Sequence, residues 1–448
     1  MKTTGVLKLS ITLVAMVTQF SYSSRGQDTI TVQRWDLNQC ISYALENNIQ
    51  VSKQKLSELS GQWDVSQAKA RRLPSLSANV SQSLTNSKDF TSSVNGKWDV
   101  SNGLTGLLSS SLTIYGGGAV SKTIEKSKVD LEIARLNTEQ AKNNITLSIT
   151  QAYLNVLYAQ ETYDYANQIM VASAQQLKQA EIFYKTGKTT KKDLAEIQSQ
   201  YASDEYSLVT AENNLVSRKT DLKQQLEISV TDEFDVFFPP LESLSVVSAI
   251  PSKMEALNKA IDAMPDMKIS KMEISSSNLS LAISRAAYYP TLSLNGSVAT
   301  NYSDSRSSSF TRQLSDNNNQ QLGLTLSIPI FTKYSTKTSV AKSKIALKQT
   351  ELSGREIEKN LLQEVELAYQ NVQTGQGRYG AALKQMDASE VSYRLSEEQF
   401  KLGMLNTVEL VKAKSSYLNA QKELTQSKYS LILNQKILDF YMGNAITL

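Results

Sequence analysis

The stretch that decides the fold is residues 119–186, which read AVSKTIEKSKVDLEIARLNTEQAKNNITLSITQAYLNVLYAQETYDYANQIMVASAQQLKQAEIFYKT. It contains neither glycine nor proline, the two residues that most often interrupt a helix. A continuous helix of this length would extend about 100 Å, at 1.5 Å per residue. The sequence therefore predicts a molecule far longer than an ordinary domain.

A heptad pattern runs along this stretch. Apolar and small residues recur in alternating steps of four and three, a period that predicts left-handed supercoiling against a neighbouring helix. Because many of these positions are small, we expect the helices to approach closely. We call this pattern the first seam: Ile145, Ile149, Ala152, Val156, Ala159, Tyr163, Ala166, Met170, Ser173, Leu177, Ala180 and Tyr184.

Gly187 follows the first seam and is the predicted end of the helix, because glycine readily adopts the left-handed conformation of a helix C-terminus. A second heptad pattern then begins, which predicts a returning helix and hence a helical hairpin that turns at residues 186–193. Asp193 would begin the returning helix, where a carboxylate favours the helix dipole. The returning pattern is Leu194, Ile197, Tyr201, Asp204, Leu208, Ala211 and Leu215.

The chain repeats itself at an offset of 216 residues. Pro74 corresponds to Pro290 and Gly187 to Gly403, and no gap is needed anywhere in the series. A second hairpin is therefore predicted to turn at residues 402–409, with Glu409 at the start of its returning helix. The period is too long for a solenoid and indicates a duplicated half-molecule. The second seam is Leu361, Val365, Ala368, Val372, Gly375, Tyr379, Ala382, Met386, Ser389, Tyr393, Ser396 and Phe400.

Four shorter segments alternate apolar and polar residues and predict strands, at about residues 75–86, 104–114, 291–300 and 320–330. Each is roughly ten residues long, the length of a tilted membrane-spanning strand. A soluble sheet with one wet face alternates in the same way. The long helices favour the membrane interpretation. The polar segments between paired strands, 86–103 and 301–319, are predicted to be exposed loops.

The N-terminus resembles an export signal. Lys2 and Lys8 precede the apolar run 11–17, and small residues allow cleavage after Ser23 or Gly26. The predicted organisation is a signal peptide at 1–26, a first repeat at 27–229, a linker at 230–253 and a second repeat at 254–448. No later stretch is apolar enough to predict a membrane-spanning helix.

Composition excludes several functional classes. The chain has no histidine and one cysteine, Cys40, which excludes intramolecular disulfides, histidine-containing catalytic triads, histidine metal sites and cysteine clusters. We interpret Cys40 as an ordinary helix residue, and we expect no catalytic residue, no metal and no cofactor. Loss of residues 1–26 would lower the formal charge from +4 to +1. A nearly neutral chain lacks the excess of positive charge that binding of nucleic acid requires.

The order of these elements, found twice, resembles the TolC-type outer-membrane efflux protein family over essentially the whole mature chain. The residues that carry the resemblance are Asp36-Leu37 through Ala44-Leu45, Leu73-Pro74-Ser75-Leu76, Tyr289-Pro290-Thr291-Leu292, Ile114-Tyr115-Gly116-Gly117-Gly118, Pro329-Ile330-Phe331, Tyr184-Lys185-Thr186-Gly187 with Asp193-Leu194, and Phe400-Lys401-Leu402-Gly403 with Glu409-Leu410.

The resemblance implies an α+β membrane protein and a homotrimer in the outer membrane. Four strands per chain would close a 12-stranded β-barrel, continued by a coiled-coil tunnel through the periplasm. It also implies passive export of small molecules or protein in a tripartite efflux or type I secretion system. The partners would be outer-membrane lipid, a periplasmic adaptor protein and, indirectly, an inner-membrane pump.

The resemblance also assigns two sites. The adaptor-docking tips would be Thr186, Gly187, Lys188, Asp193, Leu402, Gly403, Met404, Leu405 and Glu409. A possible tunnel entrance is formed by Glu390, Arg394, Glu397 and Glu398. Members of the family carry an acidic ring at two positions that are Val391 and Arg394 here, so this chain departs from the family at its entrance.

The sequence offers two other functional classes as alternatives. A function as a secreted coiled-coil structural or adhesive surface protein would explain the seams, but such a protein does not require four strands of barrel length. An exported carboxylate-dependent hydrolase would need paired acidic residues in one site. The acidic residues here recur at i,i+3 and i,i+4 spacings, which is typical of solvated helices. Glycines 354, 375, 377 and 380 in the second long stretch predict either close helix contacts or a bending point.

Overall fold

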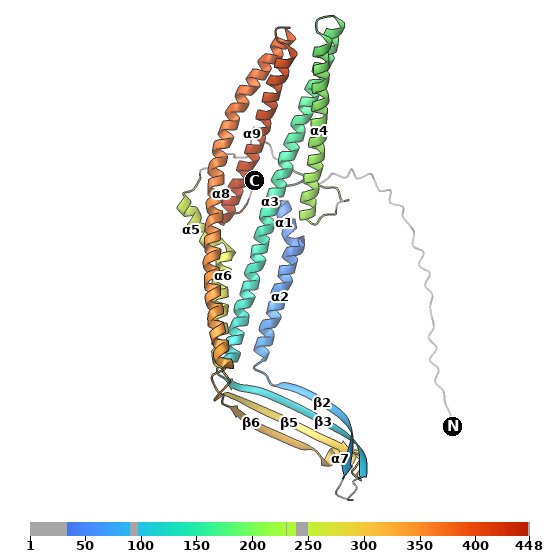
Figure 1. The fold of residues 1–448 in the computed structure, drawn as a ribbon, viewed down its shortest axis with the longest axis vertical. Coiled ribbons are helices and arrows are strands. Elements are labelled where there is room, and N and C mark those ends of the chain that lie inside the picture. Colours follow the sequence, from blue (N-terminus) through green and yellow to red (C-terminus); the bar gives the residue numbers. More distant parts are fainter. Residues whose placement is uncertain (1–33, 90–96, 230, 239–249, 447–448) are drawn as a thin grey trace, which may run out of the picture.

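The computed structural model describes residues 34–89, 97–229, 231–238 and 250–446. The predicted export signal at 1–26 and much of the predicted linker, residues 230 and 239–249, lie outside the described residues. The described part has an α+β fold that is mostly helical. A bundle of long helices stands on one end of a four-stranded sheet (Figure 1).

Each long helix of the second half begins and ends 216 residues after its counterpart in the first half. The first-half helices are α1 (Leu37–Asn47), α2 (Ile49–Ala70), α3 (Ala119–Lys185) and α4 (Lys191–Gln225). The second-half helices are α5 (Lys253–Ala263), α6 (Pro265–Ala286), α8 (Ser335–Lys401) and α9 (Thr407–Tyr441).

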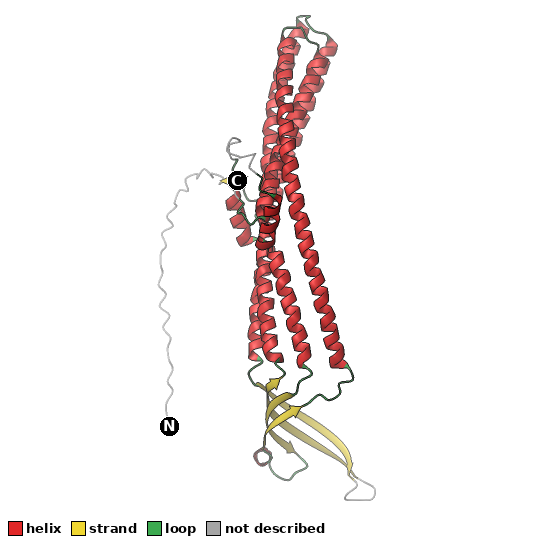
Figure 2. Cartoon of the chain, turned by 90° about the vertical axis from the view of Figure 1, so that its left-hand side faces the viewer, coloured by secondary structure: helices red, strands yellow, loops and turns green. Residues whose placement is uncertain are grey.

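Helices α3 and α8 have 67 residues each and run from the sheet to the far end of the molecule, as Figures 1 and 2 show. Helices α2 and α6 lie along the half nearest the sheet, and α4 and α9 lie along the half farthest from it. The α3–α4 and α8–α9 hairpins therefore end in two tips at the same end, opposite the sheet.

The glycines of α8 do not interrupt this helix, which is continuous from Ser335 to Lys401. A Cβ atom at Gly375 would lie 3.2 Å from the Leu431 side chain of α9, and one at Gly354 would lie 2.7 Å from Ser270 Oγ of α6. These two glycines therefore allow the close helix contacts that the sequence predicted as one alternative.

The main core lies near the middle of the helical bundle, at the waist of the molecule, where α1 packs against the long helices. Cys40 of α1 is fully buried and belongs to the same buried cluster as Val156 of α3 and Leu222 of α4. It is an ordinary helix residue, as predicted, and burial raises the pKa of its thiol to about 12. A smaller cluster around Ala256, Ala260 and Val365 joins α5 to α8.

A short parallel pair of strands closes the waist. Strand β1 (Arg34–Trp35) pairs with β4 (Asp235–Val236). Lys219 donates a hydrogen bond to Asp235 at 2.8 Å. Burial alone would raise the pKa of the Asp235 carboxyl, but the hydrogen bond from Lys219 and the nearby positive charges lower it below its ordinary value.

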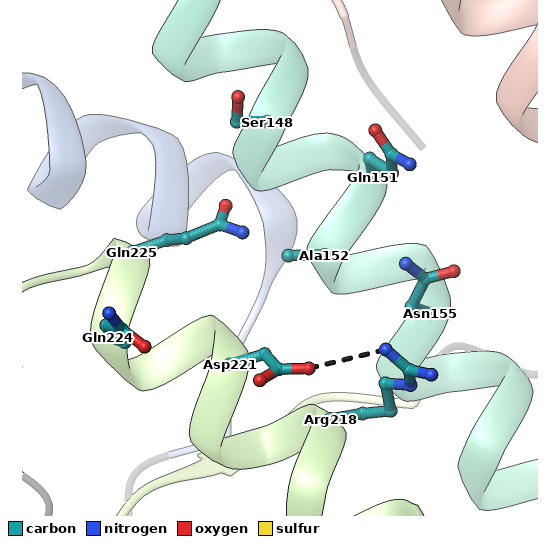
Figure 3. Close-up of a pocket in the computed structure, with 8 residues that line it drawn as sticks. All are labelled: Ser148, Gln151, Ala152, Asn155, Arg218, Asp221, Gln224 and Gln225. Carbon is teal, nitrogen blue, oxygen red and sulfur yellow. Dashed lines mark hydrogen bonds and ion pairs between the residues drawn. The ribbon is translucent and has the colours of Figure 1, made fainter.

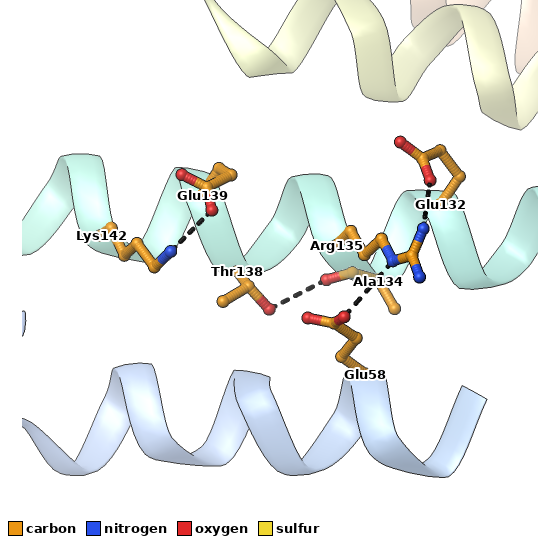
Figure 4. Close-up of polar contacts among 7 residues, drawn as sticks. All are labelled: Glu58, Glu132, Ala134, Arg135, Thr138, Glu139 and Lys142. Atoms are coloured by element: carbon orange, nitrogen blue, oxygen red, sulfur yellow. Dashed lines mark hydrogen bonds and ion pairs between the residues drawn. The ribbon is translucent and has the colours of Figure 1, made fainter. Parts of the chain in front are cut away.

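An ion pair links α2 to the lower half of α3. Arg135 lies 3.3 Å from Glu58 of α2 and 3.2 Å from Glu132 of its own helix (Figure 4). Lys142 pairs with Glu139 at 2.7 Å one turn farther along. These side chains are partly exposed, and pairs of this kind contribute about 0–1 kcal/mol each, so packing holds α2 on α3 more than charge does.

The sheet has the order β2-β3-β5-β6 with antiparallel neighbours: β2 (Ser75–Asp89), β3 (Lys97–Gly116), β5 (Thr291–Ser303) and β6 (Asn319–Ser327). Directly opposed residues share a face. Leu112, Leu294 and Leu324 are opposed in this way, and so are Thr113, Ser293 and Thr325. One face of the sheet is therefore largely apolar and the other largely polar.

Three sequence predictions about this region were wrong in part. The predicted loop at 86–103 is shorter, because β2 continues to Asp89 and β3 begins at Lys97. The predicted loop at 301–319 contains a helix, α7 (Phe310–Asp316), which packs on β5 through hydrogen bonds between Gln313 and Ser303. Strand β6 ends at Ser327 rather than 330, because Pro329 has no N–H for a strand ladder.

Two glycines at the turn from β3 into α3 give a matched pair for a stability test. Gly117 and Gly118 both have left-handed φ angles, 62° and 82°. A Cβ atom at Gly117 would lie 2.7 Å from the Ala286 carbonyl oxygen, whereas one at Gly118 would meet nothing within 4 Å. The corresponding turn of the second half has Lys333 and Tyr334 at φ 50° and 63°, so side chains are tolerated there when space is open.

We therefore expect Gly118→Ala to cost about 1–2 kcal/mol, the usual penalty of a left-handed alanine. Gly117→Ala should cost at least about 1 kcal/mol more, because the backbone of the α6 terminus must move. Thermal unfolding of the purified protein in detergent would measure both. Equal midpoints for the two variants would show that the Gly117 contact is unimportant.

Candidate functional site

The two tips have the same backbone geometry. Gly187 and Gly403 have φ angles of 73° and 76°, which confirms that each long helix ends at a left-handed glycine. The N–H of Lys188 donates to the Phe183 carbonyl, and the N–H of Met404 donates to the Gln399 carbonyl, both at 2.8 Å. These bonds satisfy carbonyl groups that a helix end leaves unpaired.

The returning helices are capped by side chains. Thr190 and Asp193 form a reciprocal capping box at the start of α4, with the Thr190 hydroxyl 2.6 Å from the Asp193 carboxylate. The hydrogen bond from Thr190 lowers the pKa of Asp193. Asn406 accepts from the N–H of Glu409 at 2.9 Å in the second tip. Thr407 donates to Asp193 at 3.4 Å, so the two tips touch.

The residues predicted for the tips differ in exposure. The apolar side chains of Leu402 and Met404 are 73% and 74% exposed. Thr186, Lys188 and Glu409 are also exposed, whereas Asp193 and Leu405 are partly buried. The Lys188 ammonium lies 5.7 Å from the centre of the Phe183 ring. The structure thus brings the predicted tip residues together at one end of the molecule.

The residues predicted for a tunnel entrance lie on α8 near its tip. Glu390 and Arg394 are exposed. Lys401 lies 3.0 Å from Glu398 and 3.8 Å from Glu397, so one lysine counters two carboxylates. The hydrogen bond to Glu398 raises the pKa of Lys401.

Sequence reasoning missed a buried ionic cluster between the two hairpins. The Lys414 ammonium of α9 donates to the Asp204 carboxylate of α4 at 2.6 Å, and both side chains are almost fully buried, at 1% and 4% exposed. Ser173 of α3 hydrogen-bonds to both groups. Gln200 donates to the second carboxylate oxygen at 2.9 Å. The cluster is therefore shared by three helices of two hairpins.

Part of this cluster was visible in the sequence. Ser173 and Asp204 occupy predicted heptad core positions, and an aspartate there is unusual because burial of a charge needs a partner. The partner could not be found from the repeat. The residue 216 positions before Lys414 is Gln198, which is exposed, and the residue 216 positions after Asp204 is Ala420. The cluster thus breaks the internal symmetry.

Three tyrosines surround the same junction. Tyr393 of α8 stacks on Tyr417 of α9 with ring centres 5.3 Å apart, and Tyr165 of α3 lies 6.1 Å from Tyr417. Gln176 donates to the Tyr393 hydroxyl at 3.0 Å. Burial raises the pKa of both Tyr165 and Tyr393, so these phenols stay neutral and act as packing groups.

A polar groove of about 490 Å³ runs between α3 and α4 near the waist (Figure 3). Gln151 and Asn155 line one side, and the Arg218–Asp221 ion pair, at 3.3 Å, lines the other. A similar groove between α8 and α9 contains Asn371, the counterpart of Asn155. Over the described ranges no group of acidic, histidine or cysteine residues could hold a metal ion.

Within the part of the chain that the structure describes, no helix is both long and apolar enough to cross a membrane.

Comparison with known proteins places these features in a family. The sequence profile described as "Outer membrane efflux protein" matches residues 40–226 and 256–444. The chain is 21% identical to outer membrane protein TolC of Salmonella enteritidis over 328 residues. This match covers 72% of the chain and 65% of that protein, so the chain spans just under two thirds of its relative.

Solved structures share the fold. A crystal structure of CusC, from work on its folding and transmembrane channel formation, is similar to this chain. The two align with a TM-score of 0.79 and 17% identity, over 98% of this chain and all of that one. The Campylobacter jejuni CmeC outer membrane channel aligns with a TM-score of 0.77 and 18% identity, over 91% of this chain and 85% of that one. Since the family profile matches most of both halves, the chain belongs to the outer membrane efflux protein family.

Proposed function

We propose that this chain is an exit duct of the outer membrane, through which small molecules or proteins leave the periplasm passively. The observation that carries the proposal is the sheet, which has one apolar face and one polar face and stands at the end of helices about 100 Å long. An apolar outer face suits lipid, and a polar inner face suits a water-filled passage.

The sheet is incomplete in one chain. Strands β2 and β6 are its edges, and an unpaired strand edge is very costly inside a bilayer. Joining edges between copies removes this cost, and three copies would give the 12-stranded barrel that the sequence predicts. The long helices of each copy, α2, α3, α4, α6, α8 and α9, would then continue the barrel as a periplasmic tunnel.

The tips are the proposed contact with a periplasmic adaptor protein, which would link the duct to an inner-membrane pump. Three exposed apolar side chains at one tip, Leu402, Met404 and Val408, support this assignment, because exposed apolar residues that gather in one patch mark protein contacts. Glu390, Arg394, Glu397 and Glu398 would line the tunnel entrance beside them. A tripartite efflux system and a type I secretion system would use the same geometry.

Assembly is the first test. We expect the detergent-purified protein to have about three times the mass of the mature chain, because the four strands of one chain cannot close a barrel and three copies would give the proposed twelve. Native mass spectrometry or light scattering with detergent correction would measure this mass. A protein that is a stable monomer in detergent would argue against both the barrel and the exit duct.

Adaptor docking is the second test. Replacing Lys188 and Met404 by aspartate leaves the glycine geometry of both tips unchanged, so trimers should assemble as in the wild type. Export by cells and crosslinking to the adaptor should fall together, because charge is placed on the proposed contact surface. Replacement of Lys412, an exposed residue farther along α9, is the matched control. Full export by the double tip variant would show that the tips are only structural turns and do not contact an adaptor.

A further inference from the structure

The connection between β6 and α8 exposes apolar, aromatic and basic side chains together. Ile330, Phe331 and Tyr334 are 94%, 73% and 65% exposed, and the Phe331 and Tyr334 rings meet edge to face with their centres 6.1 Å apart. The Lys337 ammonium lies 5.3 Å from the centre of the Tyr334 ring. Aromatic and basic side chains gather in this way where the lipid tails of a membrane meet the headgroups.

Two residues of this connection keep an unfavourable backbone conformation. Lys333 and Tyr334 have φ angles of 50° and 63°, a region that residues with a side chain mostly avoid. Their counterparts in the first half are Gly117 and Gly118, for which such angles have little steric cost. Strained residues of this kind cluster at sites of function. Here the strain presents an exposed lysine and an exposed tyrosine at the end of the sheet.

The two lysines of this connection also lie at the unfavourable end of a helix. Lys333 precedes α8 by two residues, Lys337 lies in its first turn, and that turn contains no acidic residue. Because a helix N-terminus has a partial positive charge, lysines there are unfavourable unless an anion lies close. Neither lysine forms an ion pair with any residue that the structure describes.

A second pair of cations lies between α2 and β2. Arg71 and Arg72 are exposed and form no ion pair within the described ranges. Residues 66–75 and 327–344, which surround the two pairs of cations, contain no acidic residue. Helix α2 leads into one edge strand of the sheet, and α8 follows the other edge strand, at the same end of the sheet (Figure 1).

The proposed ring would bring the two pairs of cations side by side. Within the chain, the connections of the neighbouring strands β3 and β5 touch, since a Cβ atom at Gly117 would lie 2.8 Å from the Tyr289 side chain. Joining the sheet edges β6 and β2 between copies, as the exit duct requires, brings their connections together in the same way. The two lysines of one copy would then lie next to the two arginines of a neighbouring copy.

We propose that an anionic phospholipid of the periplasmic leaflet binds at each boundary between copies, with its phosphate between Lys333 and Lys337 of one copy and Arg71 and Arg72 of the next. This inference rests on the proposed exit duct and gives it a lipid ligand. Four cations without an acidic residue repel one another, and a phosphate group between them removes the repulsion. Lysine and arginine clusters beside a membrane-spanning segment attract anionic lipid.

The four cations are specific to the boundary between copies. Their counterparts 216 positions away are Ala287 and Tyr288 for the arginines and Gly117 and Ser121 for the lysines. The equivalent junction within each chain, between β3 and β5, is therefore uncharged at all four positions. The proposal accordingly predicts one lipid site per copy, at the boundary, and none at the junction inside the chain.

Titration of the detergent-purified protein with lipid tests the site. The probe is phosphatidylglycerol, and native mass spectrometry counts the lipid molecules that remain bound. Phosphatidylcholine, whose headgroup has no net charge, is the comparison. We expect one tightly bound phosphatidylglycerol per copy and about tenfold weaker binding of phosphatidylcholine, because the four cations act on the net negative charge of the headgroup.

Two double variants remove the cations from either side of the site. Lys333→Gln with Lys337→Gln should weaken phosphatidylglycerol binding by about tenfold, and Arg71→Gln with Arg72→Gln should weaken it by a similar factor. Equal effects are expected because each pair contributes one side of the same site. Loss of binding in one variant, with wild-type binding in the other, would contradict a site shared between copies.

Control variants separate the site from total charge and from folding. Lys359→Gln with Lys384→Gln removes two exposed lysines of α8 farther from the sheet and should bind phosphatidylglycerol as the wild type does. Lys333→Arg with Lys337→Arg keeps both charges and should also retain binding. Native mass is measured for every variant, so that loss of lipid is compared only among proteins that assemble.

The possible results separate the lipid site from the exit duct. A ring by native mass that binds both lipids equally, or whose double variants bind as the wild type does, overturns the lipid site and leaves the exit duct intact. Full displacement of phosphatidylglycerol by inorganic phosphate at the same concentration also overturns it, because the site would then take a free anion. Two equivalent lipids per copy would contradict the boundary. A monomer by native mass overturns both proposals.

Discussion

Replacing Lys414 by methionine is expected to destabilise the helical hairpins by about 3–5 kcal/mol, because it leaves the buried Asp204 carboxylate without its partner. Asp204 is 4% exposed on its side chain and accepts from Lys414 at 2.6 Å. Ser173 and Gln200 would still donate to it, but neither carries a positive charge. Urea unfolding followed by far-ultraviolet circular dichroism would measure the change.

Two variants sharpen this result. Lys412→Met removes an exposed lysine two residues away on the same helix, and surface changes of this kind usually lie within about 0.5 kcal/mol of the wild type. The double variant Lys414→Met with Asp204→Leu should recover much of the loss, since an apolar pair can replace a buried ion pair. A Lys414→Met variant as stable as Lys412→Met would show that Asp204 is satisfied without lysine.

The position of the cluster suggests what it contributes. Asp204 and Ser173 belong to the first hairpin and Lys414 belongs to the second. The seams consist of apolar and small residues that pack with little directional preference, whereas a buried charge pair is satisfied in one register. We expect the cluster to fix the relative position of the two hairpins, and its loss to reduce the Thr407–Asp193 contact at the tips as well.

Patterns that depend on local sequence predicted the fold well. The absence of glycine and proline over 119–186 predicted a helix that the structure shows from Ala119 to Lys185, and the alternation at Leu324 and Thr325 predicted the two faces of the sheet. Both signals arise from neighbouring residues on one element, so one sequence is enough to read them.

Features that depend on distant residues were missed. Lys414 is an ordinary helix lysine by sequence, and only packing against Asp204, 210 positions away, gives it a partner. Helix α7 lies in a segment of low complexity, where Gln313 reaches back to Ser303. The hydrogen bonds that stabilise it come from tertiary contact, which composition does not reveal.

The chain belongs to the outer membrane efflux protein family. The apolar and polar faces of the sheet would determine which side of it meets lipid. We expect Leu324→Arg to cost about 2–4 kcal/mol and to prevent assembly in the membrane, because an arginine near the bilayer midplane on the lipid face is strongly unfavourable. Leu324 opposes Leu294 in the apolar face and is exposed in the single chain. The measurement is the amount of assembled oligomer in the outer-membrane fraction.

Thr325→Arg is the matched control, since it adds the same charge one residue away on the opposite face. Thr325 accepts a hydrogen bond from Asn295 at 3.2 Å among other polar side chains, and an arginine there would enter a water-filled passage. We expect it to assemble at near wild-type levels, because the lumen side of a barrel accepts charge. Equal assembly of the two variants would mean that the apolar face does not meet lipid, and the sheet would then need another role.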